Sequence, residues 1–171
     1  QMCIRDRKGG VLDDLTLSKY KESLDVNSEN IHLLSPNGTI NPYFIETGWI
    51  NNNEIEVPNQ NTIWKSNSSS LSPSNPVTLE WTNSKNITFK KIFTIDENYM
   101  FSITQEIENK SNEDIEIYPY RVIKRINTPD TIGFFILHEG LISLVDDELL
   151  EKNYDDLADC LLYTSDAADD P

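Results

Sequence analysis

The chain has 171 residues, of which 37% are hydrophobic, and this is enough for one domain with a modest hydrophobic core. Its formal net charge of −15 argues against nucleic-acid and anionic-membrane partners, because binding to phosphate groups depends on Lys and Arg. The longest apolar run near the end covers residues 134–137, far short of the roughly 20 residues that a membrane-spanning helix needs. The chain is therefore either a soluble protein or a fragment of a larger one.

The first half of the chain contains short strand candidates separated by polar segments. Residues 11–17 are rich in apolar side chains, although their spacing does not settle a period. Residues 31–34 and 43–45 flank Ser35-Pro36-Asn37-Gly38, a turn-forming tetrapeptide, so we predict a hairpin there. Asn, Ser and Pro dominate residues 51–76, which predicts a long loop with one short strand.

Residues 77–120 contain four segments in which apolar and polar residues alternate, with short polar turns between them. In the first segment, Val77, Leu79 and Trp81 alternate with polar residues, which predicts a strand with one buried face. The next segment keeps this alternation except at Lys91, which interrupts the apolar face. The pattern predicts an antiparallel meander of at least three strands in an all-β protein.

The segments that follow are shorter. The alternation changes phase at Pro119, which predicts either a β-bulge or an edge position, because proline cannot donate a ladder hydrogen bond. Residues 133–138 form a compact apolar strand candidate, and residues 141–145 are expected to pair nearby. Residues 146–152 are predicted to form a single helical turn, too short to organise a domain.

No residue pattern in the chain is suited to catalysis or to metal and cofactor binding. The two histidines, His32 and His138, lie far apart in the sequence and have no cysteines at zinc-like spacing. His138 and Glu139 are adjacent, so in a strand their side chains point to opposite faces and cannot act as a dyad. We find no glycine-rich phosphate loop, nucleophile elbow or calcium loop, and we nominate no catalytic, metal-binding or cofactor-binding residue.

Aromatic residues are the remaining candidates for a binding groove that takes a sugar, peptide or lipid tail: Trp49, Trp64, Trp81, Tyr118 and Tyr120. Trp81 lies on the apolar face of a predicted strand and is expected to pack in the core. Trp64 lies in a polar loop and is expected to be an exposed recognition residue, although a loop tryptophan also often caps the open end of a sandwich. We therefore take Trp64, Tyr118 and Tyr120 as candidate groove or partner contacts.

The two ends of the chain differ in character from the middle. Residues 1–7 and 159–171 look like translated sequencing adapter, and the plainer alternative is a pair of disordered termini. Cys3 and Cys160 are the only cysteines and both lie in these ends, so no disulfide is inferred. We expect residues 8–158 to be the domain and the two ends to be artefacts.

Several segments between these ends carry a family likeness. They are KGGVLDDLTLSKY from Lys8, NPYFIETGW from Asn41, NPVTLEW from Asn75, FTIDENYMFSITQEIEN from Phe93, IYPYRVIKR from Ile117 and TPDTIGFFILHEGLI from Thr128. Together, and in this order, they resemble the periplasmic domain of the YidC membrane-protein insertase family of Gram-negative bacteria. The resemblance covers residue 8 to about residue 157.

The resemblance implies a twisted antiparallel β-sandwich, a super-β-sandwich similar to galactose mutarotases. The family proteins insert and fold inner-membrane proteins, alone or with the Sec translocon, and they need no cofactor. The implied location is the bacterial inner membrane, with this segment facing the periplasm. The implied partners are Sec translocon components and nascent membrane proteins. The transmembrane insertase core is absent from this chain.

The family domain continues with further strands after the position of residue 157, so the sandwich is expected to be incomplete. Missing strands expose ladder edges, and we expect the fragment alone to be marginally stable or prone to aggregate. The rival interpretation is a mutarotase-like carbohydrate-binding or carbohydrate-active β-sandwich, for which only Asp130, Glu139 and the two histidines are arguable acid–base residues. A third is a secreted adhesin without any membrane helix.

Overall fold

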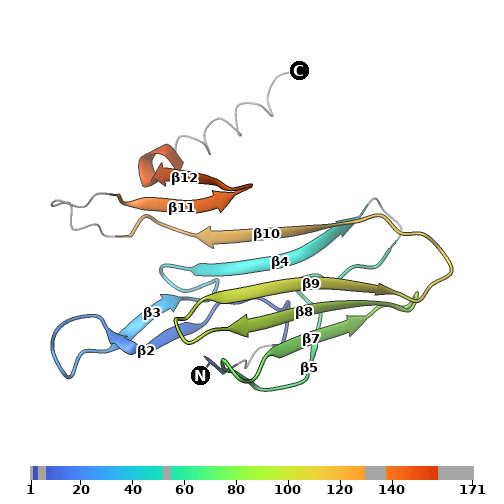
Figure 1. The fold of residues 1–171 in the computed structure, drawn as a ribbon, viewed down its shortest axis with the longest axis horizontal. Helices are drawn as coiled ribbons and strands as arrows, with labels where there is room; N and C mark the ends of the chain where they lie inside the picture. Colours follow the sequence, from blue (N-terminus) through green and yellow to red (C-terminus); the bar gives the residue numbers. More distant parts are fainter. Residues whose placement is uncertain (1, 4–6, 52–54, 130–137, 158–171) are drawn as a thin grey trace. The chain divides into compact units, whose positions relative to one another are not determined.

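The computed structural model describes residues 2–3, 7–51, 55–129 and 138–157. The chain divides into two compact units, Gln1–Ile126 and Asn127–Pro171, and each is considered by itself. The paired strands of both units run antiparallel (Figure 1), as predicted for an all-β chain. Within the described ranges, no helix has the length and apolar character needed to span a membrane.

Twelve strands are assigned in the described residues, the first of which pairs with the sixth. In chain order they are β1 (Met2–Cys3), β2 (Leu15–Lys21), β3 (Asn30–Leu34), β4 (Tyr43–Asn51), β5 (Lys65–Ser66), β6 (Ser70–Leu71), β7 (Val77–Thr82), β8 (Ile87–Ile95), β9 (Phe101–Asn109), β10 (Ile117–Arg125), β11 (Gly140–Val145) and β12 (Glu148–Asn153). The loop predicted over residues 51–76 therefore contains two short strands, β5 and β6, rather than one.

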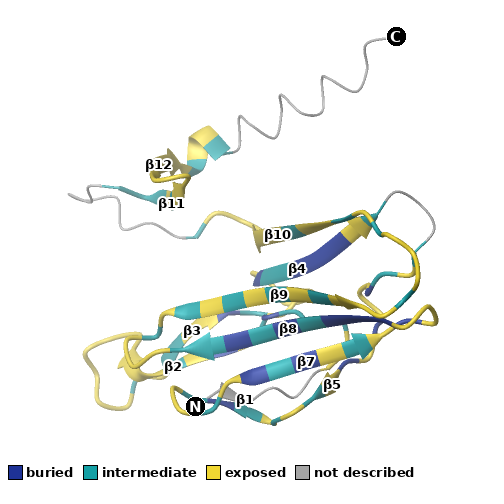
Figure 2. Cartoon of the chain, turned by 45° about the vertical axis from the view of Figure 1, so that its right-hand side comes forward, coloured by how far each residue is buried: buried dark blue, intermediate teal, exposed yellow. Residues whose placement is uncertain are grey.

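The predicted meander is confirmed for β7, β8 and β9, which form a four-stranded sheet in the order β5-β7-β8-β9. Val77 lies opposite Phe93, and Trp81 lies opposite Phe89. Directly opposed residues share a face of the sheet, so the apolar positions of β7 and β8 meet on one side. Figure 2 shows buried and more exposed residues along these strands.

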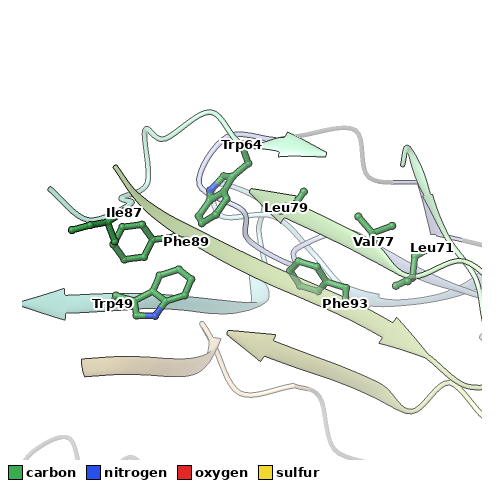
Figure 3. Packing of buried hydrophobic residues seen from close by; sticks show 8 residues of the cluster. All are labelled: Trp49, Trp64, Leu71, Val77, Leu79, Ile87, Phe89 and Phe93. Carbon is green, nitrogen blue, oxygen red and sulfur yellow. The ribbon is translucent and has the colours of Figure 1, made fainter. Parts of the chain in front are cut away.

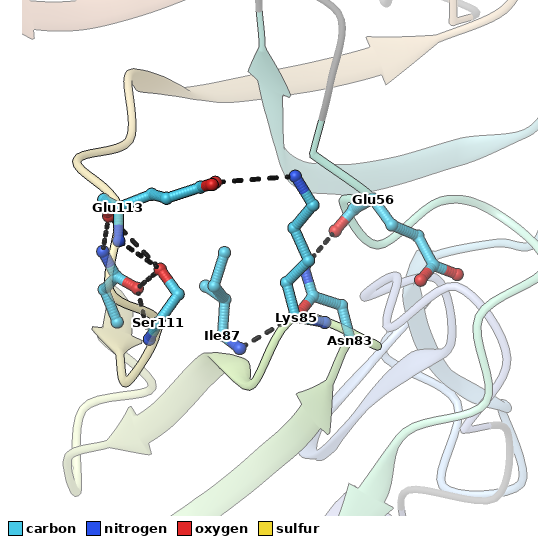
Figure 4. A network of polar contacts seen from close by, with 7 residues as sticks. Glu56, Asn83, Lys85, Ile87, Ser111 and Glu113 are labelled. Carbon is cyan, nitrogen blue, oxygen red and sulfur yellow. Dashed lines mark hydrogen bonds and ion pairs between the residues drawn. The ribbon is translucent and has the colours of Figure 1, made fainter.

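The turn between β7 and β8 is held by the side chain of Asn83, which is 7% exposed. Its Oδ1 accepts hydrogen bonds from the backbone N–H groups of Lys85 and Ile87, each at 3.0 Å, and its Nδ2 donates to the Glu56 carbonyl at 2.9 Å (Figure 4). Lys85 also forms an ion pair with Glu113 at 3.7 Å. Asn83 therefore fixes the turn and ties it to a loop distant in sequence.

The main core packs against the inner face of this sheet (Figure 3). Its buried members are Trp49, Trp64, Leu71, Val77, Leu79, Ile87, Phe89 and Phe93. Trp49 comes from β4 and meets Phe89 edge-on, with ring centroids 5.1 Å apart. Trp81 is partly buried and packs against the cluster, as expected. A strand outside the four-stranded sheet thus covers the sheet's apolar face, as in a β-sandwich.

The fourth alternating segment pairs differently from the first three. β10 pairs with β4 in an unbroken register that places Pro119 opposite Trp49, so there is no bulge at the proline. Among the described strands β10 pairs with β4 alone, and Pro119 therefore lies on an edge strand, which is the other predicted possibility. An edge position suits proline, because it cannot donate a ladder hydrogen bond.

The strands near the N-terminus pair differently from the predicted hairpin. β3 pairs with β2, and only the single bridge between Ser35 and Tyr43 connects the end of β3 to β4. A second small core, Leu12, Leu15 and Leu34, lies under these strands. The sequence pattern missed this arrangement because β2 and β3 are irregular, with shifts in their register.

The second unit contains an antiparallel hairpin of β11 and β12, in which Val145 lies opposite Glu148. The predicted helical turn over residues 146–152 is wrong. Asp146 and Asp147 have φ angles of 50° and 66°, and two such residues form the tight turn that reverses a hairpin. Residues 141–145 form a strand as predicted, whereas the strand predicted at residues 133–138 falls almost entirely outside the described residues.

Candidate functional site

Trp64 is a core residue and not an exposed recognition residue. Its side chain is 1% exposed, so the expectation that this loop tryptophan faces solvent is wrong. Its ring centroid lies 6.3 Å from that of Trp49. The loop turns inward here because the large indole ring gains more by burial than a polar surface position offers.

Lys91 lies beside Trp64 and is also buried, at 1% exposure. Its Nζ donates hydrogen bonds to the carbonyl oxygens of Thr47 at 2.5 Å, Gly10 at 3.0 Å and Gly9 at 3.3 Å. The ammonium group lies 5.0 Å from the centroid of the Trp64 ring. The lysine that interrupts the apolar face of β8 therefore joins β8, β4 and the segment that precedes β2.

The charge of Lys91 is costly to bury. Desolvation lowers the pKa of its amine from 10.5 to about 8, and the nearby Glu46 carboxylate opposes this effect. The three carbonyl oxygens supply the hydrogen bonds that water would otherwise make. Gly10 approaches this group closely, because a Cβ there would lie 2.9 Å from Trp64 Nε1 and its φ is +60°. Only glycine fits that position without strain.

A second tight arrangement lies across β4 and β10. Tyr120 is paired with Gly48, and a Cβ on Gly48 would lie 2.6 Å from atoms of the tyrosine ring. The ring thus lies where a side chain would otherwise stand. The Tyr120 hydroxyl donates a hydrogen bond to Glu46 Oε1 at 2.8 Å, and burial together with this carboxylate raises the pKa of Tyr120 to about 12. Gly48 therefore positions Tyr120 over β4.

These groups line a cleft of about 260 Å³ in the first unit. Its lining comes from residues 9–13, β4, β10, the 58–60 loop, Asn37 and Lys91. Two carboxylates, Asp13 and Glu46, and two amines, Lys91 and Lys124, face this space. The cleft is therefore polar, and the formal charges of its two carboxylates and two amines balance.

The three candidate residues from the sequence are not brought together. Tyr120 lines the cleft, Trp64 is buried in the core, and Tyr118 is 46% exposed on β10. Tyr118 donates a hydrogen bond to Glu116, and this bond raises the pKa of the phenol. Tyr118 lies opposite Ile50 and two positions from Tyr120, so both tyrosines are on one face of the β4–β10 pair.

The sequence alone did not indicate Glu46 and Gly48 as residues of the cleft, and it showed Lys91 only as an interruption of an apolar strand face. A buried lysine within an otherwise apolar strand face was the available signal. Among the described residues, no cluster of three or more His, Cys, Asp or Glu side chains could hold a metal ion. His32 instead lies beside Thr16, with Nδ1 3.2 Å from the hydroxyl.

The comparison with known families identifies the architecture around this cleft. The sequence model of the YidC periplasmic domain matches residues 5–170. The chain belongs to the YidC periplasmic domain family. This agrees with the resemblance found from the ordered sequence segments and with the all-β fold.

Relatives with the name membrane protein insertase YidC match most of the chain. The protein of Methylobacterium radiotolerans is 45% identical over 152 residues, which is 88% of this chain and 25% of that relative. The protein of Methylorubrum extorquens is 42% identical over 149 residues, or 86% of the chain and 24% of the relative. The protein of Pelagibacter ubique is 41% identical over 154 residues, which is 89% of this chain and 27% of that relative. The chain spans about a quarter of the length of these YidC proteins.

Proposed function

We propose that this chain is part of the periplasmic domain of a membrane-protein insertase that helps to insert and fold inner-membrane proteins. The observation that carries the proposal is the match of the YidC periplasmic domain family to residues 5–170. The domain acts as a scaffold and docking surface and performs no catalysis. It faces the periplasm at the inner membrane, and its partners are nascent membrane proteins and components of the Sec translocon.

The face of β10 that carries the tyrosines is the proposed contact surface. Ile50 and Tyr118 are opposed across the strands and are 57% and 46% exposed. Val122 lies on the same face and is 45% exposed. Adjacent exposed apolar side chains of this kind favour binding of an apolar polypeptide. Tyr118 and Tyr120 remain the candidate contacts, whereas the buried Trp64 supports the core behind them.

The domain boundaries are also a proposal. Residues 8–158 are native sequence and residues 1–7 and 159–171 are adapter-derived, although the family match itself extends over residues 5–170. The sandwich is completed in the intact protein by further strands, which is supported by the greater length of the YidC relatives. Sequencing the gene from its source organism tests both statements. If the genomic gene itself encodes residues 1–7 and 159–171, the adapter assignment is contradicted.

The insertase role is tested in a chimera. Residues 8–157 replace the matching segment of the Methylobacterium radiotolerans protein, and a photocrosslinking amino acid is placed at Tyr118 or, as a control, at Met100, which is 68% exposed. We expect insertion activity to be retained and nascent membrane proteins or Sec components to be crosslinked from position 118 and not from 100. Loss of insertion, or equal crosslinking from both positions, contradicts the proposal.

A further inference from the structure

The cleft over β4 and β10 contains hydrogen-bonding groups that other parts of the protein do not use. The side-chain amides of Asn37 and Gln60 line it and have no hydrogen-bond partner within the described chain. The Tyr120 hydroxyl donates to Glu46, which leaves its oxygen free to accept. Lys124 is exposed on β10 at the same cleft and has no ion-pair partner in the described part. Donors and acceptors are therefore both available.

The balance of charge selects the kind of ligand. Asp13 and Glu46 oppose Lys91 and Lys124, and the three hydrogen bonds of Lys91 are already made to backbone carbonyls. A bound anion would be repelled by the two carboxylates, and a bound cation would be repelled by the two ammonium groups. The two carboxylates and the two amines give the cleft no formal net charge, so a ligand without net charge is favoured over an ion of either sign.

The size and the remaining lining narrow the ligand further. A cleft of about 260 Å³ is smaller than the roughly 300–1,000 Å³ of sites for drug-sized ligands, so it takes one small ring rather than a helix. An apolar membrane segment does not suit a lining rich in charged and amide groups. Val11, Phe44 and Pro58 provide apolar contact for carbon atoms of the ring. Hydroxyl groups both donate and accept, as this lining requires.

We propose that this cleft binds a neutral sugar as a single ring, whose hydroxyl groups are held by the Glu46–Tyr120 pair, Asn37 and Gln60. No reaction is assigned to it. Tyr120 belongs both to this cleft and to the proposed contact surface, whereas Tyr118, where docking is tested by crosslinking, does not line the cleft. Failure of sugar binding thus leaves the insertase proposal intact, and failure of insertion leaves the sugar site intact.

The test is a titration of the ¹⁵N-labelled chain with D-glucose and with D-galactose, followed by amide chemical shifts. We expect saturable shifts at residues 46–48, 59–60 and 120. Tyr120→Phe keeps the ring over Gly48 and removes the hydroxyl, and Glu46→Gln removes the carboxylate. Glu46→Gln is expected to weaken binding about tenfold, the effect of losing one hydrogen bond to a charged group, and Tyr120→Phe several-fold, the effect of losing one hydrogen bond between neutral groups. Tyr118→Phe, on the same strand but outside the cleft, leaves binding unchanged.

Gln60→Ala is a second variant, used in case the substitutions in β4 and β10 disturb the sheet and weaken binding for that reason alone. Its amide has no side-chain partner in the described residues, so the variant is expected to fold as the parent does and to bind the sugar several-fold more weakly. Inorganic phosphate and an apolar peptide are titrated in parallel. Absence of saturable sugar shifts, shifts confined to other regions, unaltered binding by Gln60→Ala, or preferential binding of phosphate or peptide at the cleft each overturns the proposal.

Discussion

Replacement of Lys91 by methionine is the most informative perturbation of the fold. Lys91 is 1% exposed, and burial lowers the pKa of its amine from 10.5 to about 8. Below pH 8 the amine is charged in both the folded and the unfolded chain. Between about pH 8 and 10.5 it is neutral when folded but still binds a proton when unfolded, so stability rises with pH. The full difference corresponds to roughly 3 kcal/mol.

The assay is urea unfolding of the parent chain and of Lys91→Met at a series of pH values from 7 to 10.5. Other titrating groups cancel when the two unfolding free energies are subtracted at each pH. We expect the parent to gain up to about 3 kcal/mol relative to Lys91→Met over this range. Lys90→Met is the matched control, because Lys90 lies at the next position and forms only a solvent-accessible pair with Glu108 at 3.5 Å.

A flat difference between the parent and Lys91→Met refutes the claim that Lys91 is buried at the cost of a lowered pKa. A difference that falls with pH also contradicts it. That result means that the hydrogen bonds to the carbonyls of Gly9, Gly10 and Thr47 outweigh desolvation and hold the proton more tightly in the folded state.

Three further experiments test particular contacts. Asn83→Ala removes the turn hydrogen bonds and is expected to lower the free energy of chemical unfolding by about 1–3 kcal/mol. The control Lys85→Ala removes an exposed ion pair and is expected to lower it by less than about 1 kcal/mol. Equal losses in the two variants contradict the role of Asn83. Gly48→Ala is expected to displace the Tyr120 ring and to destabilise the chain. In a double-mutant cycle, adding Tyr120→Ala to Gly48→Ala should recover part of this loss of stability. If the stability losses of the two single variants simply add, the contact between Gly48 and Tyr120 is contradicted. Asp147→Gly relieves a positive φ and should slow amide exchange in the β11–β12 hairpin, so faster exchange there refutes the turn assignment.

The meander could be predicted from sequence because its signal is local. In β7 and β8 alternate residues face the core, and Val77, Trp81 and Phe93 show this period directly. The turn at residues 146–147 was missed for the opposite reason. Its acidic residues suit either a helix start or a turn, and only the cross-strand partners of β11 and β12 decide between them.

The cleft could not be predicted because its residues come from separate segments. Glu46 and Tyr120 meet only because β10 returns beside β4, a pairing between segments about 70 residues apart in sequence that no periodicity encodes. Trp64 was misplaced for a similar reason. Polar neighbours indicated a surface loop, whereas the core that receives the indole is built by Trp49 and Phe89.

The central claim is that residues 8–157 belong to the periplasmic part of a membrane-protein insertase. The most direct measurement is the sequence of the intact gene in its source genome. We predict that the reading frame continues on both sides of this segment into apolar stretches of roughly 20 residues, long enough to span a membrane. A reading frame that closes on both sides without any such stretch contradicts the account.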